Sequence, residues 1–429
     1  MGTLVLFGGF FVLLLAGTPI VFAMALAALL LLLTLGRDLP LTLIPHQMVA
    51  ATDSFLLLAI PLFFLAGELM NAGGITARLV RFAACLVGHI RGGLAHVTIL
   101  ASMIMSGFSG SAVADASAVG SVLVPSMRRE GYDPAFAAAV TAAAATAGPI
   151  IPPSIPMIIY AATGEVSVGA LFMAGVVPGL LLGVYLMAAV FVISRRRGYP
   201  TRPRATLGEL GRATVEASWA LLAPVIVLGG ILIGVVTPTE AAALAVLYSL
   251  VIGLFVYREI RWRDVPGILR QSAVSTGVVM IIVAASGIMG WEVANLRVGE
   301  QVLAVILGIS REPWFVLLLI NVLFLILGCF LDPLAIIIIF VPVFLPLVKA
   351  VGIDLVHFGL VVVLNVTIGL VTPPVGYLLY ICASIAGTPV EPVVREVMPF
   401  LLALLLTLIL CTYWPAMVLS VPRLLLGGG

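Results

Sequence analysis

The sequence predicts an all-α polytopic membrane protein with an inverted repeat, two re-entrant helical hairpins and two broken transmembrane helices. Of its 429 residues, 62% are hydrophobic and 9% are charged, whereas about a quarter of a soluble domain is charged. Apolar runs of the roughly 20 residues that a membrane-spanning helix needs recur from end to end. A helix also pairs its own backbone groups, as lipid requires. A set of glycine, proline, threonine and aspartate positions occurs twice, 221 residues apart.

The duplicated set consists of residues that fix backbone geometry. The first copy contains SGFSGSAVADAS and TAGPIIPPS, and the second contains GCFLDP and TIGLVTPPV. Corresponding positions are Gly107 and Gly328, Pro125 and Pro346, Gly131 and Gly352, Asp133 and Asp354, Thr146 and Thr367, Gly148 and Gly369, and Pro152-Pro153 and Pro373-Pro374. A unit that is duplicated with its helix breakers in register predicts two equivalent halves.

The first repeat is predicted over residues 1–213. Its expected elements are a span over 4–35 that is interrupted at Gly17-Thr18-Pro19, a span over about 52–70, an interfacial segment over 73–88, a hairpin over 93–128, a broken helix over 134–162 and a span over 169–194. Each arm of the hairpin, on either side of a tip at Ser106–Ser111, is too short for a full crossing. The helix over 134–162 is long enough, but Gly148-Pro149 and Pro152-Pro153 interrupt it, because proline lacks a backbone donor and clashes with the preceding turn.

A linking transmembrane helix over 214–236 leads to the second repeat, residues 237–429. The expected elements there are spans over 241–257 and 268–290, an interfacial segment over 293–309, a hairpin over 313–348, a broken helix over 355–386 and a final span over 399–418. The basic cluster at Arg195–Arg197 indicates the cytoplasmic side. Counting crossings from it places the bases of the two hairpins on opposite sides, so the second repeat is expected upside down relative to the first.

Inverted repeats with paired broken helices are typical of secondary transporters whose site lies near the membrane midplane. Helix ends inside the membrane expose carbonyls, which together with hydroxyls suit a small cation such as Na⁺, and N–H groups, which suit an anion. Ser106, Ser109 and Ser111 supply hydroxyls in the first tip. Ser111 aligns with Asp332, and both stand at N-cap positions, so capping is favoured over direct ligation.

Other polar residues in apolar surroundings have two interpretations. Asp115 is a functional candidate as an intramembrane carboxylate, or else it caps or pairs locally. Asn365 is either a site residue or a contact between helices. Thr372 and Ser154 flank the proline pairs, where they can face the same cavity. Glu68 lies near the end of a span, where a solvated or structural role is expected.

The paired motifs SGFSGSA with TAGPIIPPS, and GCFLDP with TPPVGYLLY, resemble the large membrane subunit of tripartite ATP-independent periplasmic (TRAP) transporters. The resemblance covers essentially the whole chain. It implies an elevator-type transporter in the bacterial inner membrane, driven by two or more Na⁺ ions. It also implies two partners: a small four-helix membrane subunit, expected as a separate chain, and a periplasmic binding protein that delivers a small organic acid.

Carried over by motif, the resemblance implies two Na⁺ sites. One would use Ser106, Ser109, Gly148, Ile151 and Pro153, and the other Gly328, Gly369, Thr372 and Val375. The candidates for substrate contact are Ser111, Asp115, Ser154, Asp332, Asn365 and Pro374. Because the second tip, GCFLD, is poor in hydroxyls, its site would depend on carbonyl oxygens.

Several alternatives stay open at this stage. The nearest is a stand-alone Na⁺- or H⁺-coupled carrier of the dicarboxylate or citrate type, which would need no binding protein. An ion channel would need a continuous polar pore, and a purely structural scaffold would not need two matched sets of helix breaks. No nucleophile–base pair, Walker motif or metal motif occurs, so neither an enzyme nor an ATP-driven pump is supported. A net charge of +2 gives no argument for nucleic-acid binding. The sequence does not distinguish a dicarboxylate from a sialic-acid-like or other carboxylate substrate.

Overall fold

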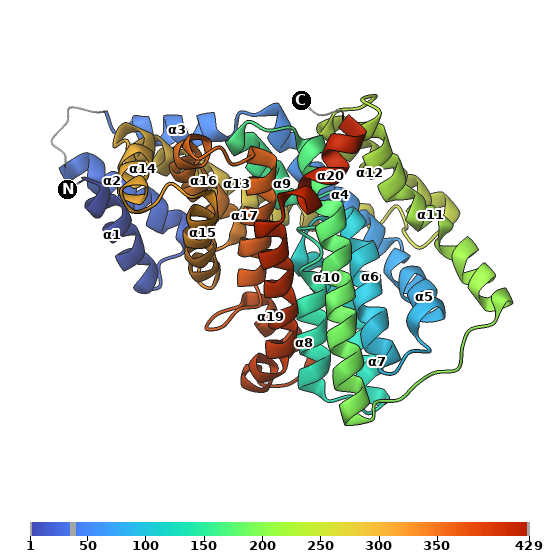
Figure 1. Ribbon diagram of the computed structural model, residues 1–429. Helices are drawn as coiled ribbons and strands as arrows, with labels where there is room; N and C mark the ends of the chain where they lie inside the picture. The colour runs from blue at the N-terminus through green and yellow to red at the C-terminus, as the bar shows by residue number, and fades with distance from the viewer. Residues whose placement is uncertain (1, 35–39, 427–429) are drawn as a thin grey trace.

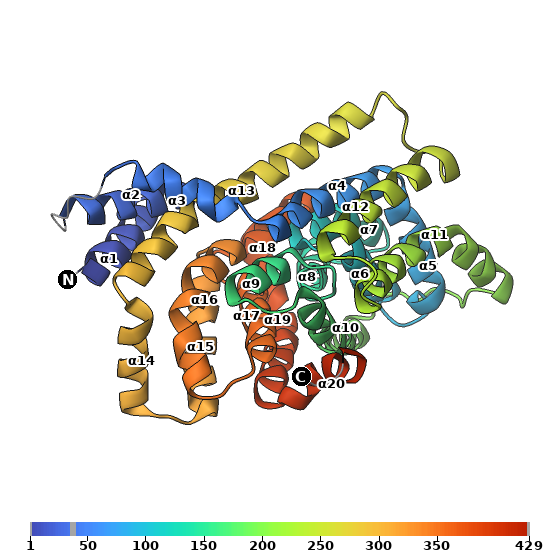
Figure 2. The same cartoon turned by 90° about the horizontal axis from the view of Figure 1, so that it is seen from above.

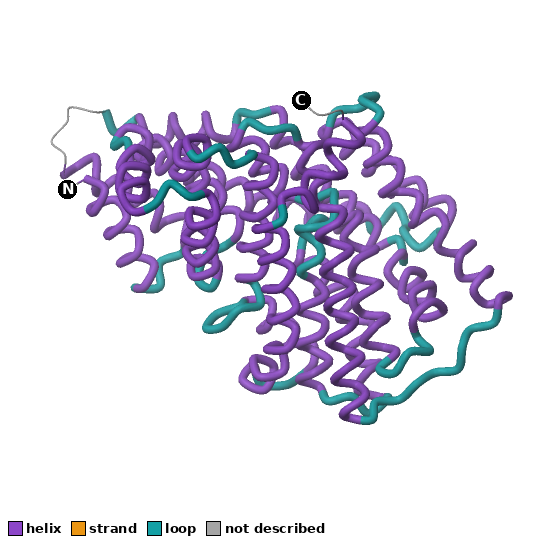
Figure 3. Tube along the Cα trace, in the orientation of Figure 1, coloured by secondary structure: helices purple, strands orange, loops and turns teal. Residues whose placement is uncertain are grey.

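The structure is a computed structural model that describes residues 2–34 and 40–426. These residues form twenty α-helices, a 3-10 helix (η1) and a π-helix (η2), joined by loops and with no strand among them (Figure 3). The predicted all-α class is therefore confirmed.

The helices of the first half follow the chain in order. They are α1 (Gly2–Leu15), α2 (Ile20–Thr34), α3 (Leu43–Thr52), η1 (Phe55–Leu58), α4 (Ala59–Ala72), α5 (Ile75–Val87), α6 (Gly93–Ser109), α7 (Ala112–Arg129), α8 (Pro134–Ala145), α9 (Ile155–Gly164) and α10 (Val168–Arg197).

The second half continues with helices of similar length. They are α11 (Leu207–Leu232), α12 (Pro238–Val251), η2 (Ile252–Val256), α13 (Val265–Asn295), α14 (Val298–Ile309), α15 (Pro313–Gly328), α16 (Pro333–Ala350), α17 (Leu355–Gly369), α18 (Tyr377–Ala386), α19 (Val390–Tyr413) and α20 (Pro415–Leu426).

The helices form a central group and a flanking group. The central group contains α6–α10 and α15–α20, which pack closely on one another. The flanking group contains α1–α5 and α11–α14, with α1 and α2 at one end of the molecule and α11 at the other (Figures 1 and 2). The long helix α13 runs between these ends and packs against α2, α3, α4 and α16 (Figure 2).

Among the residues that the structure describes, seven helical stretches are long and apolar enough to cross a membrane. They are 55–72, α10, α11, 238–256, α13, α16 and α19. Several of them keep large apolar side chains exposed; on α11 these include Trp219, Leu222 and Ile226. A surface of this kind suits contact with lipid or with another apolar helix, so the polytopic membrane class is supported by the fold as well as by composition.

Helix starts follow local capping chemistry. Asp133 and Asp354 each accept hydrogen bonds from two backbone N–H groups at the starts of α8 and α17. Thr206 and Glu209 form a reciprocal capping box, which starts α11 ahead of the position that hydrophobicity alone predicts, because both orphan donors are satisfied there.

Three further boundaries differ from the expected ones. The span predicted over 4–35 is two helices, α1 and α2, that pack against each other, and the chain turns at the predicted interruption Gly17-Thr18-Pro19, where Gly17 has a φ of +85°. Residue 35 lies outside the described residues. The expected tip Ser106–Ser111 is shorter, because α6 continues to Ser109 and Gly110 ends it with a φ of +58°. The final span begins earlier, at Val390, and ends at Tyr413, where Trp414 leaves the helical conformation ahead of a proline.

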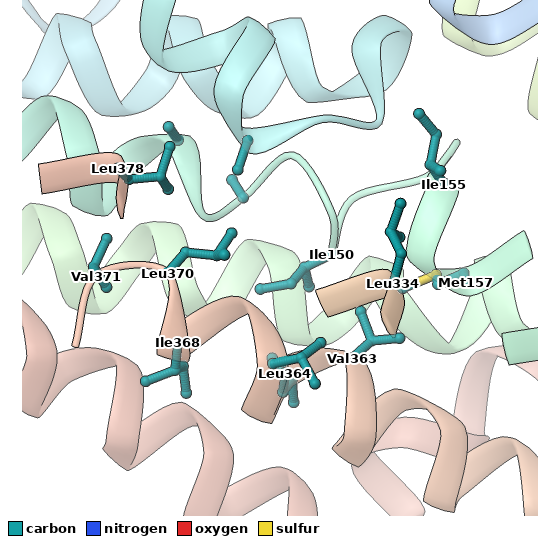
Figure 4. Close-up of a cluster of buried hydrophobic side chains, with 14 of the residues drawn as sticks. Ile150, Ile155, Met157, Leu334, Val363, Leu364, Ile368, Leu370, Val371 and Leu378 are labelled. Atoms are coloured by element: carbon teal, nitrogen blue, oxygen red, sulfur yellow. The ribbon is translucent and has the colours of Figure 1, made fainter. Parts of the chain in front are cut away.

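The two helix breaks share one apolar core (Figure 4). Ile150 and Ile155 come from the first break, and Leu370 and Val371 come from the second. Leu334, from the start of α16, joins the same cluster. The helix ends that flank both breaks are therefore held close together in the centre of the central group.

Candidate functional site

The tips of both hairpins line one cavity of about 480 Å³. Gly110 and Ser111 come from the tip between α6 and α7, and Asp332 comes from the tip between α15 and α16. The opposite wall is formed by α4 and α13 of the flanking group. The cavity therefore lies between the two helix groups.

The N-termini of α7 and α16 open onto this cavity, and its lining also includes the first residues of α9 (Ile155 and Pro156) and of α18 (Tyr377). Residues 112–114 at the start of α7 and residues 333–334 at the start of α16 are part of its lining. The first turn of a helix has N–H groups without intrahelical acceptors and carries partial positive charge. Two such ends in one cavity favour an anionic group such as a carboxylate.

Ser111 and Asp332 cap these two helices, as the sequence predicts. The Ser111 hydroxyl accepts from the Ala114 N–H at 3.5 Å, and an Asp332 carboxylate oxygen accepts from the Leu334 N–H at 2.9 Å. Both residues also line the cavity. Capping and contact with a bound molecule are therefore compatible here, because each side chain keeps an oxygen surface beyond its capping bond.

Four polar residues of the flanking group were missed as site residues by the sequence analysis. Glu68 and Asn71 lie one turn apart on α4, and Gln271 and Ser275 lie one turn apart on α13; all four line the cavity. Glu68 carried a signal, since an intramembrane carboxylate is a functional candidate by default. Gln271 and Ser275 carried none that distinguishes them from other polar helix positions.

The charged side chains that line the cavity are acidic. Among its lining residues, all of which the structure describes, the charged side chains are Glu68 and Asp332. An anion bound here would meet helix N-termini, hydroxyls and amides. Its negative charge would add to that of the two carboxylates, Glu68 and Asp332. Accompanying cations would offset this repulsion.

A hydroxyl cluster surrounds Asp115 behind the first tip. Ser109 donates to one Asp115 carboxylate oxygen at 2.5 Å, and the Ser106 hydroxyl lies 3.0 Å from the other. The Ser106 hydroxyl is also 2.7 Å from the Ser102 carbonyl oxygen. One hydroxyl hydrogen cannot bond fully to both acceptors, so a proton on Asp115 or a nearby cation would balance the cluster.

Gly148 brings the first helix break against this cluster. A methyl group at Gly148 would lie 2.8 Å from an Asp115 carboxylate oxygen and 3.0 Å from the Ser111 carbonyl carbon. A methyl group at Gly110 would lie 2.7 Å from the Pro153 carbonyl oxygen. The predicted residues Ser106, Ser109, Gly148 and Pro153 thus lie around the first tip and the adjacent break.

Ile151 departs from this group in the placement of its side chain. The side chain packs against α10, where a methyl group at Gly179 would lie 2.5 Å from it. The Ile151 N–H donates to the Ala147 carbonyl at 2.8 Å. If Ile151 contributes to a cation site, it would therefore do so through its backbone atoms.

The second tip meets its helix break through two glycines. A methyl group at Gly369 would lie 2.5 Å from the Cα, C and O atoms of Gly328. Thr372 follows in the next turn, with its hydroxyl donating to the Ile368 carbonyl at 2.7 Å and its N–H to the Gly369 carbonyl at 3.1 Å. Val375 is 40% exposed and lies beyond this contact. The arrangement is built from backbone, as the hydroxyl-poor second tip predicts.

The remaining predicted substrate residues do not line the cavity. Asp115 and Asn365 are fully buried away from it, and Pro374 is exposed. Ser154 is buried and caps α9, accepting from the Met157 N–H at 3.3 Å and donating to the Pro149 carbonyl. Of that set, the structure brings only Ser111 and Asp332 together at the cavity.

Carboxylates do not form a metal cage in the described part of the chain. Within residues 2–34 and 40–426, no three His, Cys, Asp or Glu side chains gather into a metal-binding group. The donor groups near each tip are hydroxyl and carbonyl oxygens together with one carboxylate, Asp115 at the first tip and Asp332 at the second, and oxygen ligands of these kinds are those that hard cations prefer.

Comparison with known proteins gives a consistent assignment. Residues 7–417 match the family described as "Tripartite ATP-independent periplasmic transporter, DctM component". The chain is 42% identical over 421 residues to the sialic acid TRAP transporter large permease protein SiaM of Vibrio cholerae, covering 98% of each chain. It is also 42% identical over 377 residues to the C4-dicarboxylate TRAP transporter large permease protein DctM of Pseudomonas aeruginosa, covering 88% of each.

Solved structures share the fold at low identity. The YdaH transporter of Alcanivorax borkumensis superimposes with a TM-score of 0.60 at 14% identity, covering 87% of each chain. MtrF of Neisseria gonorrhoeae superimposes with a TM-score of 0.61 at 12% identity, covering 86% of this chain and 83% of that one. At such identities the likeness concerns the fold alone.

Proposed function

This chain belongs to the DctM family of TRAP transporters, and from that premise we propose that it carries a small organic acid into the cytoplasm together with Na⁺. As a large permease subunit it is a transport protein and not an enzyme. The observation that carries the proposal is the shared cavity, where the N-termini of α7 and α16 and two capping oxygens converge. That chemistry suits a carboxylate.

The Na⁺ coupling is supported by the oxygen-rich surroundings of both tips. The first offers Ser106, Ser109 and Asp115, and the second offers the backbone of Gly328 and Gly369 with the Thr372 hydroxyl. Cations bound there would offset the charge of an anion placed beside Asp332. Transport of the anion would then depend on Na⁺.

An elevator movement is supported by where the cavity lies. One wall belongs to the central group, which carries both tips, and the other belongs to α4 and α13. A displacement of the central group relative to the flanking group would open the cavity to one side and close it to the other. The proposed inverted repeat fits helix spacing, since α7 and α16, and likewise α8 and α17, begin 221 positions apart.

The proposed setting is the bacterial inner membrane. There the chain would pair with a small four-helix membrane subunit and accept its substrate from a periplasmic binding protein. Relatives carry the names of sialic acid, C4-dicarboxylate and 2,3-diketo-L-gulonate transporters. All three substrates are organic acids, and we extend only this shared class to the chain.

Uptake into proteoliposomes tests the proposal directly. The chain is co-expressed with a small four-helix TRAP subunit, and the binding protein is added outside with labelled organic acids, with or without an inward Na⁺ gradient. We expect uptake only when both the binding protein and the gradient are present. Uptake without the binding protein would indicate a stand-alone carrier, and uptake driven by H⁺ alone would remove the Na⁺ sites.

Thr372 provides a sharper test of the second cation site. Replacing it with valine keeps the shape but removes one hydroxyl ligand. The half-saturating Na⁺ concentration for uptake should rise roughly threefold to tenfold, the equivalent of one neutral hydrogen-bonding group. Thr367→Val is the matched control, because its hydroxyl makes the same kind of bond within α17, to the Val363 carbonyl at 2.6 Å. Equal Na⁺ dependence in the two variants would exclude a role for Thr372.

A further inference from the structure

A chain of buried polar side chains joins three helices of the second half. The Asn365 amide on α17 donates to the Asn321 side-chain carbonyl on α15 at 2.7 Å. The Asn321 amide in turn donates to the Thr412 hydroxyl on α19 at 3.0 Å. Asn365 is completely buried, and Asn321 and Thr412 are nearly so. We call these three residues the carboxamide network.

The carboxamide network belongs to the same helix interface as the Gly328–Gly369 contact. Asn321 and Gly328 lie two turns apart on one face of α15, and Asn365 and Gly369 lie one turn apart on α17. A methyl group at Gly328 would lie 3.1 Å from the Gly369 Cα and 3.6 Å from the Asn365 carbonyl oxygen. The Asn365–Asn321 hydrogen bond and the Gly328–Gly369 contact are thus neighbouring contacts along the interface between α15 and α17.

The first copy lacks this network. At an offset of 221, Asn321 corresponds to Leu100 and Asn365 to Ala144. Conversely, Ser106, Ser109 and Asp115 of the first copy correspond to Leu327, Phe330 and Ile336. The fold therefore does not require polar groups at either set of positions. Each copy therefore has its own set of buried polar side chains near the hairpin tip.

The carboxamide network has both favourable and unfavourable effects on stability. Asn365 keeps one side-chain acceptor, Oδ1, that has no hydrogen-bond partner among the described residues. A buried acceptor left unbonded lowers the stability of a fold, whereas apolar side chains of the same shape would not. The unbonded oxygen thus offsets part of the stability that the hydrogen bonds of the network provide, which leaves a positioning role to be tested beside a structural one.

We propose that Asn321, Asn365 and Thr412 are positioning residues for the second cation site. By joining α15 to α17 and α19, they fix the separation at which Gly328 meets Gly369, and hence the carbonyl oxygens that the hydroxyl-poor second tip presents to a cation. The inference rests on the proposed Na⁺ coupling. In this proposal the carboxamide network holds the backbone of the second site in place, whereas the first site has side-chain ligands.

The test compares Asn321→Leu and Thr412→Val with Thr407→Val as the matched control. Thr407 is also buried on α19, but its hydroxyl bonds only to the Ala403 carbonyl of its own helix. Two quantities are measured on the purified complex with choline replacing Na⁺: the half-saturating Na⁺ concentration for uptake, and that for the Na⁺-dependent rise in Tm. The substrate concentration for half-maximal uptake is measured at saturating Na⁺.

Asn321→Leu should raise both half-saturating Na⁺ concentrations roughly tenfold, which corresponds to about 1.4 kcal/mol. Thr412→Val should raise them less, and Thr407→Val should leave both unchanged. The substrate dependence at saturating Na⁺ should stay the same, because the cavity is untouched. A Tm that falls while both Na⁺ dependences stay unchanged would overturn the proposal in favour of a structural role.

Two further outcomes separate the possible failures. If Asn321→Leu does not assemble, Thr412→Val decides alone, because valine keeps the shape of threonine. Should uptake and Tm of the unsubstituted complex ignore Na⁺, the proposed coupling and the positioning role would both be wrong. Na⁺-dependent uptake in the unsubstituted complex, with unchanged dependence in both variants, would refute the positioning role only.

Discussion

Replacing Gly369 with valine is expected to lower Na⁺-driven uptake by roughly a hundredfold, the upper range of overpacking costs of about 1–3 kcal/mol. The added Cβ would lie 2.5 Å from three backbone atoms of Gly328, which cannot rotate away as a flexible side chain can. The tip between α15 and α16 must therefore move from the second break. Uptake is measured in proteoliposomes, and size-exclusion chromatography reports assembly of the complex.

The matched control is Gly290→Val on α13. A methyl group there meets no atom within 4 Å, and valine tolerates a helix interior better than glycine does. Uptake at the unsubstituted rate in Gly290→Val and a large loss in Gly369→Val would locate the effect at the glycine contact. Normal uptake by an assembled Gly369→Val complex would show that this contact is not needed for transport.

Asp115→Asn is expected to reduce uptake by roughly ten- to a hundredfold, as removal of a charged hydrogen-bonding partner typically costs about 1.5–3 kcal/mol. Asparagine keeps the size of the side chain but loses the charge that two serine hydroxyls and, we propose, a cation surround. Half-saturating Na⁺ should rise, and the rate at saturating substrate should fall.

Asp133→Asn serves as the control for this change. Asp133 caps α8 through one oxygen that accepts from Ala135 and Phe136, and asparagine caps helices about as well. Loss of uptake in both variants would point to general damage. An Asp115→Asn variant with unaltered Na⁺ dependence would remove Asp115 from the coupling mechanism.

The site could be predicted from the sequence only where backbone geometry dictated it. The positions of glycines and prolines predicted where helices end, so the breaks near Gly148 and Gly369 were expected where the structure has them. The N-caps Ser111 and Asp332 followed from the same local chemistry. Side-chain direction was not predictable in this way. Ser154 and Asn365, expected to contact substrate, face the interior of the central group, and Glu68 faces the cavity.

The membrane class, the helical content and the positions of the helix interruptions could all be predicted from the sequence, because they depend on hydrophobicity and on residues with restricted backbones. Which interrupted ends meet depends on how the helices pack. This packing placed Asp115 against Ser106 and Ser109, joined Asn321 to Asn365, and closed the cavity with Gln271 and Glu68. Apart from the Asp115 contacts, which cross one hairpin tip, these contacts join segments distant along the chain, and nearly every face of an apolar helix is equally hydrophobic. Which polar side chains become neighbours therefore depends on how the helices pack, and no local sequence pattern predicts it.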